Sequence, residues 1–199
     1  MGDNFVETVI ELHRSKSWKE ILNLNTHSDN QNALKLLWVW PEIKNIRYIK
    51  NLVKDLGYKG IISLGCGCGL LEWIISEATG LPVLGYEINP EWWESKYSNY
   101  KFINLHYVDS ISEKTLDSNY ALLFCYFNDR EAFQKYVENY RGNLIFIIGP
   151  GDETCRHTDP EPFSADFGSS EWKLYCFQEV KSSGDYIAAY VREERSLFM

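Results

Sequence analysis

The sequence predicts an α/β protein with a seven-stranded, mostly parallel sheet, a terminal antiparallel hairpin and a helical N-terminal extension. Three observations predict this fold class. From residue 60 onward, short apolar runs alternate with amphipathic helical patterns, which is typical of a parallel sheet with crossover helices. Two longer strand patterns then close the chain, separated by KSSG, which indicates a hairpin. The first 59 residues carry only helical periodicity.

The N-terminal segment, residues 1–59, is predicted to be a helical cap on a core formed by residues 60–199. The chain has 199 residues, a length that fits one structural domain. Two stripes of apolar residues recur at helical spacing: Phe5, Val6, Val9 and Ile10, and then Ile43, Ile46, Ile49, Val53 and Leu56. Pro41 suits the first turn of the second helix, and Gly57 suits its end.

Five apolar runs are expected to form the parallel strands. They are GIISLG, LPVLGYE, KFINLHYVD, YALLFCYF and NLIFIIG, at residues 60–65, 81–87, 101–109, 120–127 and 143–149. The fourth run is continuously apolar, as a strand covered on both faces should be. Gly80 ends the helical pattern after the first strand, and the Asn-Pro pair at 89–90 opens the next helix. Residues 171–180 and 184–193 are the expected hairpin strands.

Composition argues against several classes of protein. The net charge is −8 and no run of Lys or Arg appears, so a broad nucleic-acid-binding surface is not expected. The five cysteines have neither disulfide nor zinc spacing, so no metal site is expected. The start lacks a signal-peptide pattern, and no apolar stretch approaches bilayer length. These features predict a reduced, cytoplasmic protein with no membrane partner.

The segment ISLGCGCGLLEW, residues 62–73, places three glycines at alternate positions between a strand and a helix. A phosphate-binding P-loop needs Lys followed by Ser or Thr after its last glycine, but Leu70 and Leu71 stand there. The dinucleotide fingerprint, counted from Gly65, needs a small residue at position 70, where Leu70 stands. Counted from Gly67, it would place the Glu72 carboxylate against a negatively charged pyrophosphate. A nicotinamide oxidoreductase is therefore a disfavoured alternative.

The pattern that fits is G-x-G-x-G at 65, 67 and 69, followed by an acid, Glu87, at the end of the second strand. This stretch resembles the first motif of the class I S-adenosylmethionine-dependent methyltransferases, whose usual form is close to VLDLGCGTG. GYEINP and YVDS are similar to later motifs of that family, whose Rossmann-like sheet also ends in a hairpin. The resemblance covers roughly residues 60 to 192 and concerns the cofactor class, not the methyl acceptor.

The resemblance implies S-adenosyl-L-methionine as the cofactor, and it assigns binding residues by position. Gly65, Cys66, Gly67 and Gly69 would surround the methionine and ribose portion, and Glu87 would accept bonds from the ribose hydroxyls. Cys66 and Cys68, in C-x-C spacing, could form a metal or redox pair. Two such thiols without further ligands are more often small apolar residues that fill space.

The remaining cofactor assignments follow in the same way. Ile88 would lie against the adenine face, Asp109 and Ser110 would meet the adenine amino edge, and Tyr126 would lie near the sulfonium. One position departs from the family pattern. Ser63 stands where the family commonly has an acid that helps to fix the methionine amino group.

Three residues are candidates for catalysis: Tyr126, Asn128 and His157. Asn128 lies where the family often places acceptor-facing residues, but Asn128 and Asp129 also read as a helix cap. His157 follows the fifth strand and is a candidate general base, although a loop residue is polar by default. Among the tryptophans, one from the N-terminal segment, Trp38 or Trp40, is expected to meet the ligand.

The sequence therefore predicts a methyltransferase that acts on a small molecule or a protein side chain by in-line methyl transfer. The alternative is a non-catalytic S-adenosylmethionine-binding sensor, which Ser63 and the ambiguous end of the fourth strand support. Methyl transfer mainly requires alignment of the nucleophile, methyl and sulfur, so the lack of a catalytic triad does not argue against an enzyme. The acceptor and the oligomeric state have no signal in the sequence.

Overall fold

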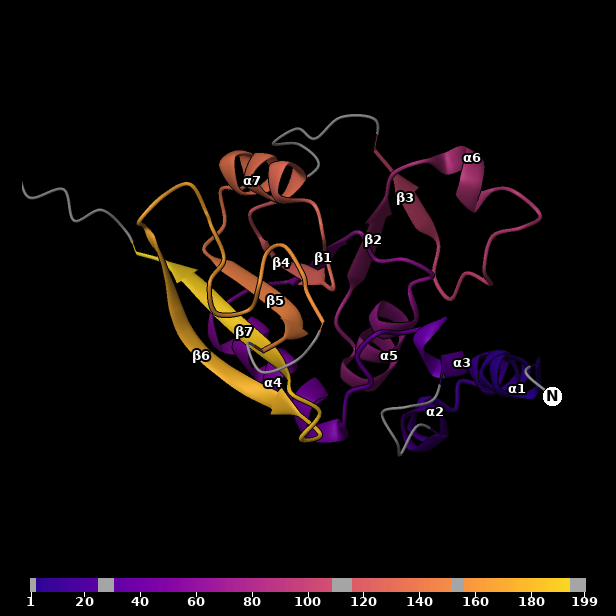
Figure 1. Ribbon diagram of the computed structural model, residues 1–199. Coiled ribbons are helices and arrows are strands. Elements are labelled where there is room, and N and C mark those ends of the chain that lie inside the picture. Colours follow the sequence, from indigo (N-terminus) through magenta and orange to yellow (C-terminus); the bar gives the residue numbers. More distant parts are fainter. Residues whose placement is uncertain (1–2, 25–30, 109–115, 152–155, 194–199) are drawn as a thin grey trace, which may run out of the picture.

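A computed structural model describes residues 3–24, 31–108, 116–151 and 156–193. Its centre is one seven-stranded sheet with the order β3-β2-β1-β4-β5-β7-β6 (Figure 1). The strands are β1 (Gly60–Leu64), β2 (Val83–Glu87), β3 (Leu105–Tyr107), β4 (Tyr120–Cys125), β5 (Leu144–Pro150), β6 (Trp172–Val180) and β7 (Asp185–Arg192). The first five are parallel, and β7 runs antiparallel between β5 and β6. The predicted fold class is confirmed.

Helices cover both faces of this sheet. They are α1 (Asp3–Arg14), α2 (Trp18–Leu24), α3 (Gln31–Leu34), α4 (Ile43–Asp55), α5 (Leu70–Thr79), α6 (Pro90–Trp93) and α7 (Arg130–Asn139). Helices α4 and α5 pack in one hydrophobic cluster with one face, and α7 packs on the other face. None of the described helices has the length and hydropathy of a membrane span.

Strand β4 shows why its sequence is apolar throughout. Ala121 and Leu123 point into the cluster with α4 and α5, whereas Leu122 and Phe124 point into the cluster with α7. All four side chains are fully buried. A strand with helices on both sides has no polar face, so the period-two alternation of a half-exposed strand is absent.

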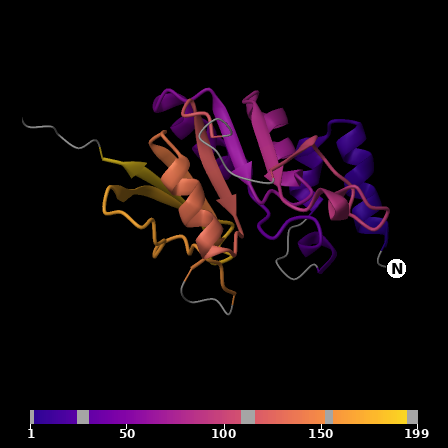
Figure 2. The same ribbon diagram turned by 90° about the horizontal axis from the view of Figure 1, so that it is seen from above.

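Helix α1 lies on the side of the molecule away from β6 and β7 (Figures 1 and 2), whereas α4 packs on β6, where the Asn45 side-chain amide donates to Oε1 of Gln178 at 2.8 Å. His13 of α1 packs edge-on against Trp73 of α5, and its Nε2 atom lies 3.0 Å from the carbonyl oxygen of Phe102. Val9 and Ile21 are buried in the cluster that contains α5. The segment before residue 60 therefore shares a core with the sheet, and its division from the core as a separate cap stays a prediction.

Two element boundaries differ from the sequence prediction. The third strand was expected over 101–109, but β3 has only three residues, because Phe102 donates its amide hydrogen to the Cys68 carbonyl outside the ladder. The helix after Asn89 is only four residues long. The backbone between α6 and β3 is thus directed toward the glycine loop instead of extending the sheet edge.

Candidate functional site

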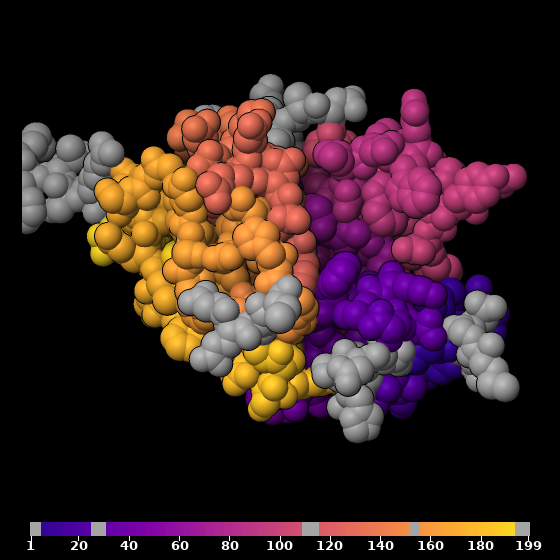
Figure 3. Space-filling model, viewed as in Figure 1, coloured from indigo at the N-terminus to yellow at the C-terminus, as the bar shows by residue number. Residues whose placement is uncertain are grey.

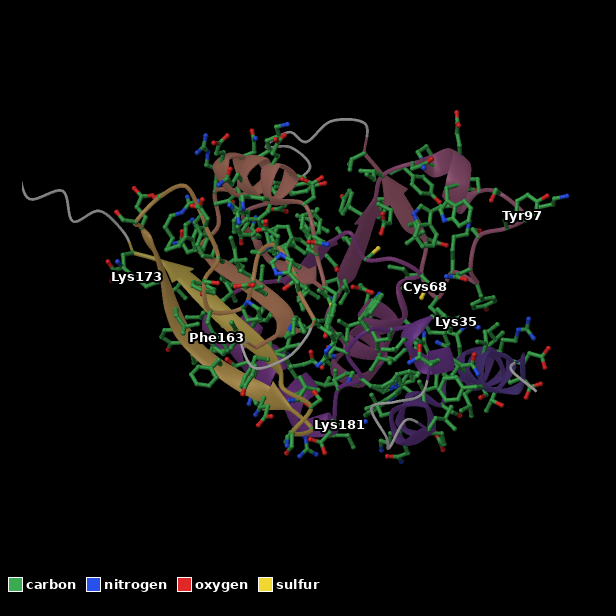
Figure 4. All side chains as sticks on the ribbon, in the orientation of Figure 1. Lys35, Cys68, Tyr97, Phe163, Lys173 and Lys181 are labelled. Atoms are coloured by element: carbon green, nitrogen blue, oxygen red, sulfur yellow. The ribbon has the colours of Figure 1, made fainter. Side chains whose placement is uncertain are left out.

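A cavity of about 240 Å³ lies at the carboxyl ends of β1 and β4. Its walls are the segment after α3, the glycine loop, the first turn of α5, two residues near α6 and the end of β4. The lining residues are Leu34, Lys35, Leu36, Leu37, Trp38, Gly65, Cys66, Gly67, Cys68, Leu71, Glu72, Trp93, Asn99, Cys125 and Tyr126. Lys35 and Cys68 lie on the side of the cavity nearest the N-terminal helices (Figure 4). On the surface, the purple N-terminal segment lies beside the orange C-terminal part (Figure 3).

The glycine loop requires the backbone freedom of glycine. Gly65, Gly67 and Gly69 have φ angles of 68°, 61° and 77°, in the left-handed region. A Cβ atom on Gly69 would collide with the Ile103 side chain, whereas a Cβ on Gly67 would meet nothing within 4 Å. Gly67 also lines the cavity, so the absence of a side chain at this position leaves the cavity open there.

Glu87 at the end of β2 holds this loop. Its Oε1 atom accepts a hydrogen bond from the Gly67 amide at 2.6 Å, and its Oε2 atom accepts one from the Ile88 amide at 3.2 Å. Burial raises the pKa of Glu87, and the two backbone hydrogen bonds oppose that rise. Ile88 itself is 62% exposed. Asp109 and Ser110, the predicted adenine contacts, lie outside the described residues.

Ser63 and Glu72 form a buried pair behind the loop. The Ser63 hydroxyl donates a 2.6 Å hydrogen bond to Oε1 of Glu72, which lines the cavity although the residue is only 1% exposed. Oε2 of Glu72 has no hydrogen-bond partner among the described residues. Burial raises the pKa of Glu72 from 4.5 to about 7. Sequence reasoning considered Glu72 only as an obstacle to pyrophosphate.

Three thiols surround this pair, those of Cys66, Cys68 and Cys125. Burial raises the pKa of each, for Cys68 to about 12. The Cys68 thiol donates to the Leu36 carbonyl oxygen at 3.1 Å. Protonated thiols are poor nucleophiles, so these side chains act as small apolar fillers. No three His, Cys, Asp or Glu side chains of the described chain are grouped as metal ligands.

Tyr126 lies at the end of β4, with a φ angle of 51°. Its hydroxyl donates a 2.5 Å hydrogen bond to Asp185, and its ring stacks on Trp38 with 5.5 Å between centroids. The Arg156 guanidinium also bonds to Asp185, at 3.1 Å, and lies 5.8 Å from the Tyr126 ring centre. Burial, and then the Asp185 carboxylate, raise the pKa of Tyr126. The phenol therefore stays protonated, and its ring is what it offers to the cavity.

The other candidate residues do not join this group. His157 is exposed, its Nδ1 atom lies 3.1 Å from Glu161, and it does not line the cavity. Asn128 is exposed and forms a backbone bridge with Asp159. The helix cap is Asp129, whose side chain accepts from the Ala132 amide at 2.9 Å. Of the N-terminal tryptophans, Trp38 lines the cavity and Trp40 is buried elsewhere.

No family model and no curated protein matches this chain. Among solved structures, magnesium protoporphyrin IX methyltransferase from Synechocystis PCC 6803 with bound SAM is 10% identical, with 96% of this chain and 98% of that chain covered and a TM-score of 0.49. The methyltransferase domain of bacterial CtHen1-C is 14% identical, with coverages of 76% and 98% and a TM-score of 0.47. Mitomycin 7-O-methyltransferase MmcR is 10% identical, with coverages of 88% and 60% and a TM-score of 0.49.

Proposed function

We propose that this protein is an S-adenosyl-L-methionine-dependent methyltransferase that acts on a small molecule or a protein side chain. The observation that carries the proposal is the glycine loop at the carboxyl end of β1, bound through Gly67 to Glu87 and open to a cavity. Open α/β sheets bind their ligands at the carboxyl ends of their strands. The strand order, with β7 inserted antiparallel between β5 and β6, is the order expected of this family.

The residues present fit the cofactor. Gly67 leaves open space at the cavity, and a side chain there would occupy it. Each carboxylate oxygen of Glu87 accepts one backbone hydrogen bond and retains acceptor capacity for a ribose hydroxyl. In this proposal Gly65, Cys66 and Gly69 surround the methionine portion, and the adenosine extends beyond the cavity over Glu87. Ile88, Asp109 and Ser110 remain the proposed adenine contacts.

The bound cofactor would supply a methyl group activated by a sulfonium. The chain's own contribution is to hold and align that group and to exclude water. Tyr126 is fixed by Asp185 and stacked on Trp38, so it presents a rigid aromatic ring to the cavity, suited to a neighbouring cation. Asn128 and His157 are proposed to contact the acceptor, from outside the cavity.

Titration calorimetry of the full chain with S-adenosylmethionine and S-adenosylhomocysteine tests the cofactor, with NAD as the control ligand. The proposal expects both sulfur nucleosides to bind and NAD not to bind. Absence of binding at millimolar ligand would overturn it. Transfer of a tritiated methyl group to cell extracts, with Glu87→Ala as the control, then tests catalysis. Cofactor binding without transfer to any acceptor would support the sensor instead.

A further inference from the structure

Glu72 lines the cavity, and its buried carboxylate has one oxygen with no hydrogen-bond partner among the described residues. Its Oε1 atom is held by Ser63, which comes from the fully buried strand β1. Its Oε2 atom lacks a partner within the described part of the chain. A buried carboxylate with an unmet acceptor is unfavourable unless a ligand or a water molecule satisfies it. This arrangement therefore points to a hydrogen-bond donor or cation that comes from outside the protein.

The described groups around Glu72 do not supply a positive charge that pairs with its carboxylate. The thiols of Cys66, Cys68 and Cys125 are neutral fillers, and Glu87 adds a like charge nearby. Among the described lining residues, Lys35 is the only Lys or Arg. Lys35 is exposed, and it forms no ion pair with Glu72 in the described structure. A ligand with its own positive charge would neutralise the carboxylate.

We propose that Glu72 and Ser63 together form the subsite for the α-ammonium group of the cofactor's amino-acid portion. The carboxylate reaches the cavity from the first turn of α5 instead of from β1, where Ser63 stands. Ser63 orients Oε1 through its hydroxyl, and Oε2 accepts a charge-assisted hydrogen bond from the ammonium. The inference rests on the proposed function, and it assigns a binding role to Glu72, in the helix that follows the glycine loop.

The subsite makes binding depend on pH in a definite direction. The ammonium pairs with the ionised carboxylate, and burial raises the pKa of Glu72 to about 7. Ligand binding below that pH must therefore release a proton, and affinity should rise from about pH 6 to about pH 8. Other groups near the carboxylate are Glu87, Lys35, Tyr126 and the three thiols, so the dependence is assigned to Glu72 by comparison with Glu72→Gln.

A four-way calorimetric comparison tests the subsite. The ligands are S-adenosylhomocysteine and its deamino analogue, which has hydrogen in place of the amino group. The proteins are the wild type and Glu72→Gln, with Glu77→Gln, an exposed acid on the same helix, as the matched control. We expect wild type and Glu77→Gln to bind S-adenosylhomocysteine at least about tenfold more tightly than the analogue, and Glu72→Gln to bind both ligands about equally.

Proton release supplies the second measurement, since it does not depend on the stability of a variant. Titration of the wild type near pH 6, in two buffers of different ionisation enthalpy, should show proton release with S-adenosylhomocysteine but not with the analogue. Equal discrimination by wild type and Glu72→Gln, or no difference in proton release between the ligands, would overturn this inference alone. A wild type that binds neither nucleoside would overturn the proposed function, and the inference with it.

Discussion

The Oε1 atom of Glu87 lies 2.6 Å from the amide nitrogen of Gly67 and joins the end of β2 to the loop that follows β1. The two strands are parallel neighbours in the sheet, with Leu64 opposite Tyr86, so their carboxyl ends meet at one edge. A side chain that closes one strand thereby shapes the loop of the next. In the proposed function, the loop geometry and the contact with the ribose depend on the same carboxylate.

Glu87→Ala should therefore weaken binding of S-adenosylhomocysteine and of its deamino analogue alike, by at least about tenfold, because both ligands carry the ribose. Titration calorimetry checks this, with Glu91→Ala, an exposed acid of α6, as the control. A selective loss for the amino ligand only would contradict the ribose assignment. The pattern also separates Glu87 from Glu72, whose substitution should affect only the ligand with an amino group.

Two glycines of the loop should respond differently to alanine. Gly67→Ala places a Cβ in open space at a φ angle of 61°, so it should cost about 1 kcal/mol of stability, through backbone strain alone. Gly69→Ala adds a collision with Ile103 and should cost about 2–4 kcal/mol. Urea unfolding measures both losses.

The two alanine variants also distinguish an effect on ligand binding from an effect on protein stability. Gly67→Ala fills the ligand space and should abolish nucleoside binding in a folded protein, as circular dichroism and calorimetry would show together. Adding Ile103→Val to Gly69→Ala should recover part of the lost stability, because the colliding side chain becomes smaller. Equal losses for the two alanine variants, with no recovery, would contradict the packing described for Gly69.

The aromatic ring of Tyr126 should favour the positively charged ligand. Tyr126→Phe keeps the ring and should retain any preference for S-adenosylmethionine over S-adenosylhomocysteine, whereas Tyr126→Leu should reduce that preference about three- to tenfold. Calorimetry with the two ligands gives the ratio directly, and any general loss of packing cancels in it. An unchanged ratio in Tyr126→Leu would argue against a cation contact at this ring.

Glu72 should also lower the stability of the unliganded protein at high pH. Its pKa is about 7 in the folded protein and 4.5 ordinarily, so between these values the folded state binds more protons than the unfolded chain. Stability is therefore retained below about pH 4.5 and is lost as the pH rises to about 7, by at most about 3.5 kcal/mol. Glu72→Gln should be more stable than the wild type near pH 8.

Urea unfolding across this pH range measures the difference, with Glu77→Gln as the exposed control on the same helix. The advantage of Glu72→Gln should shrink as the pH falls from about 7 to about 4.5 and should be constant below that, where Glu72 is protonated in both states. A difference that does not vary with pH would show that the pKa of Glu72 is the same in the folded and the unfolded protein, and would contradict this prediction.

Local sequence patterns predicted the elements whose environment is uniform along their length. Within the apolar run from 120 to 127, β4 covers Tyr120–Cys125 and its central residues are buried on both faces, and the alternate glycines before α5 have left-handed φ angles. Prediction from sequence was less accurate for elements whose length depends on contacts with other segments. The run from 101 to 109 gave only a three-residue strand, because Phe102 bonds to the glycine loop and leaves the sheet edge.

By itself, the sequence determined the sheet with its final hairpin, the glycine loop and the acid that ends β2, since periodicity and glycine spacing are local properties. Only the tertiary structure decided which side chains meet. Ser63 and Glu72 are nine positions apart on different elements, and packing leaves one carboxylate oxygen of Glu72 buried without a partner among the described residues. Tyr126 and Asp185 are 59 positions apart, and only strand order brings them within a hydrogen bond. Desolvation and contact between distant segments are properties of the packed chain, so no local pattern contains them.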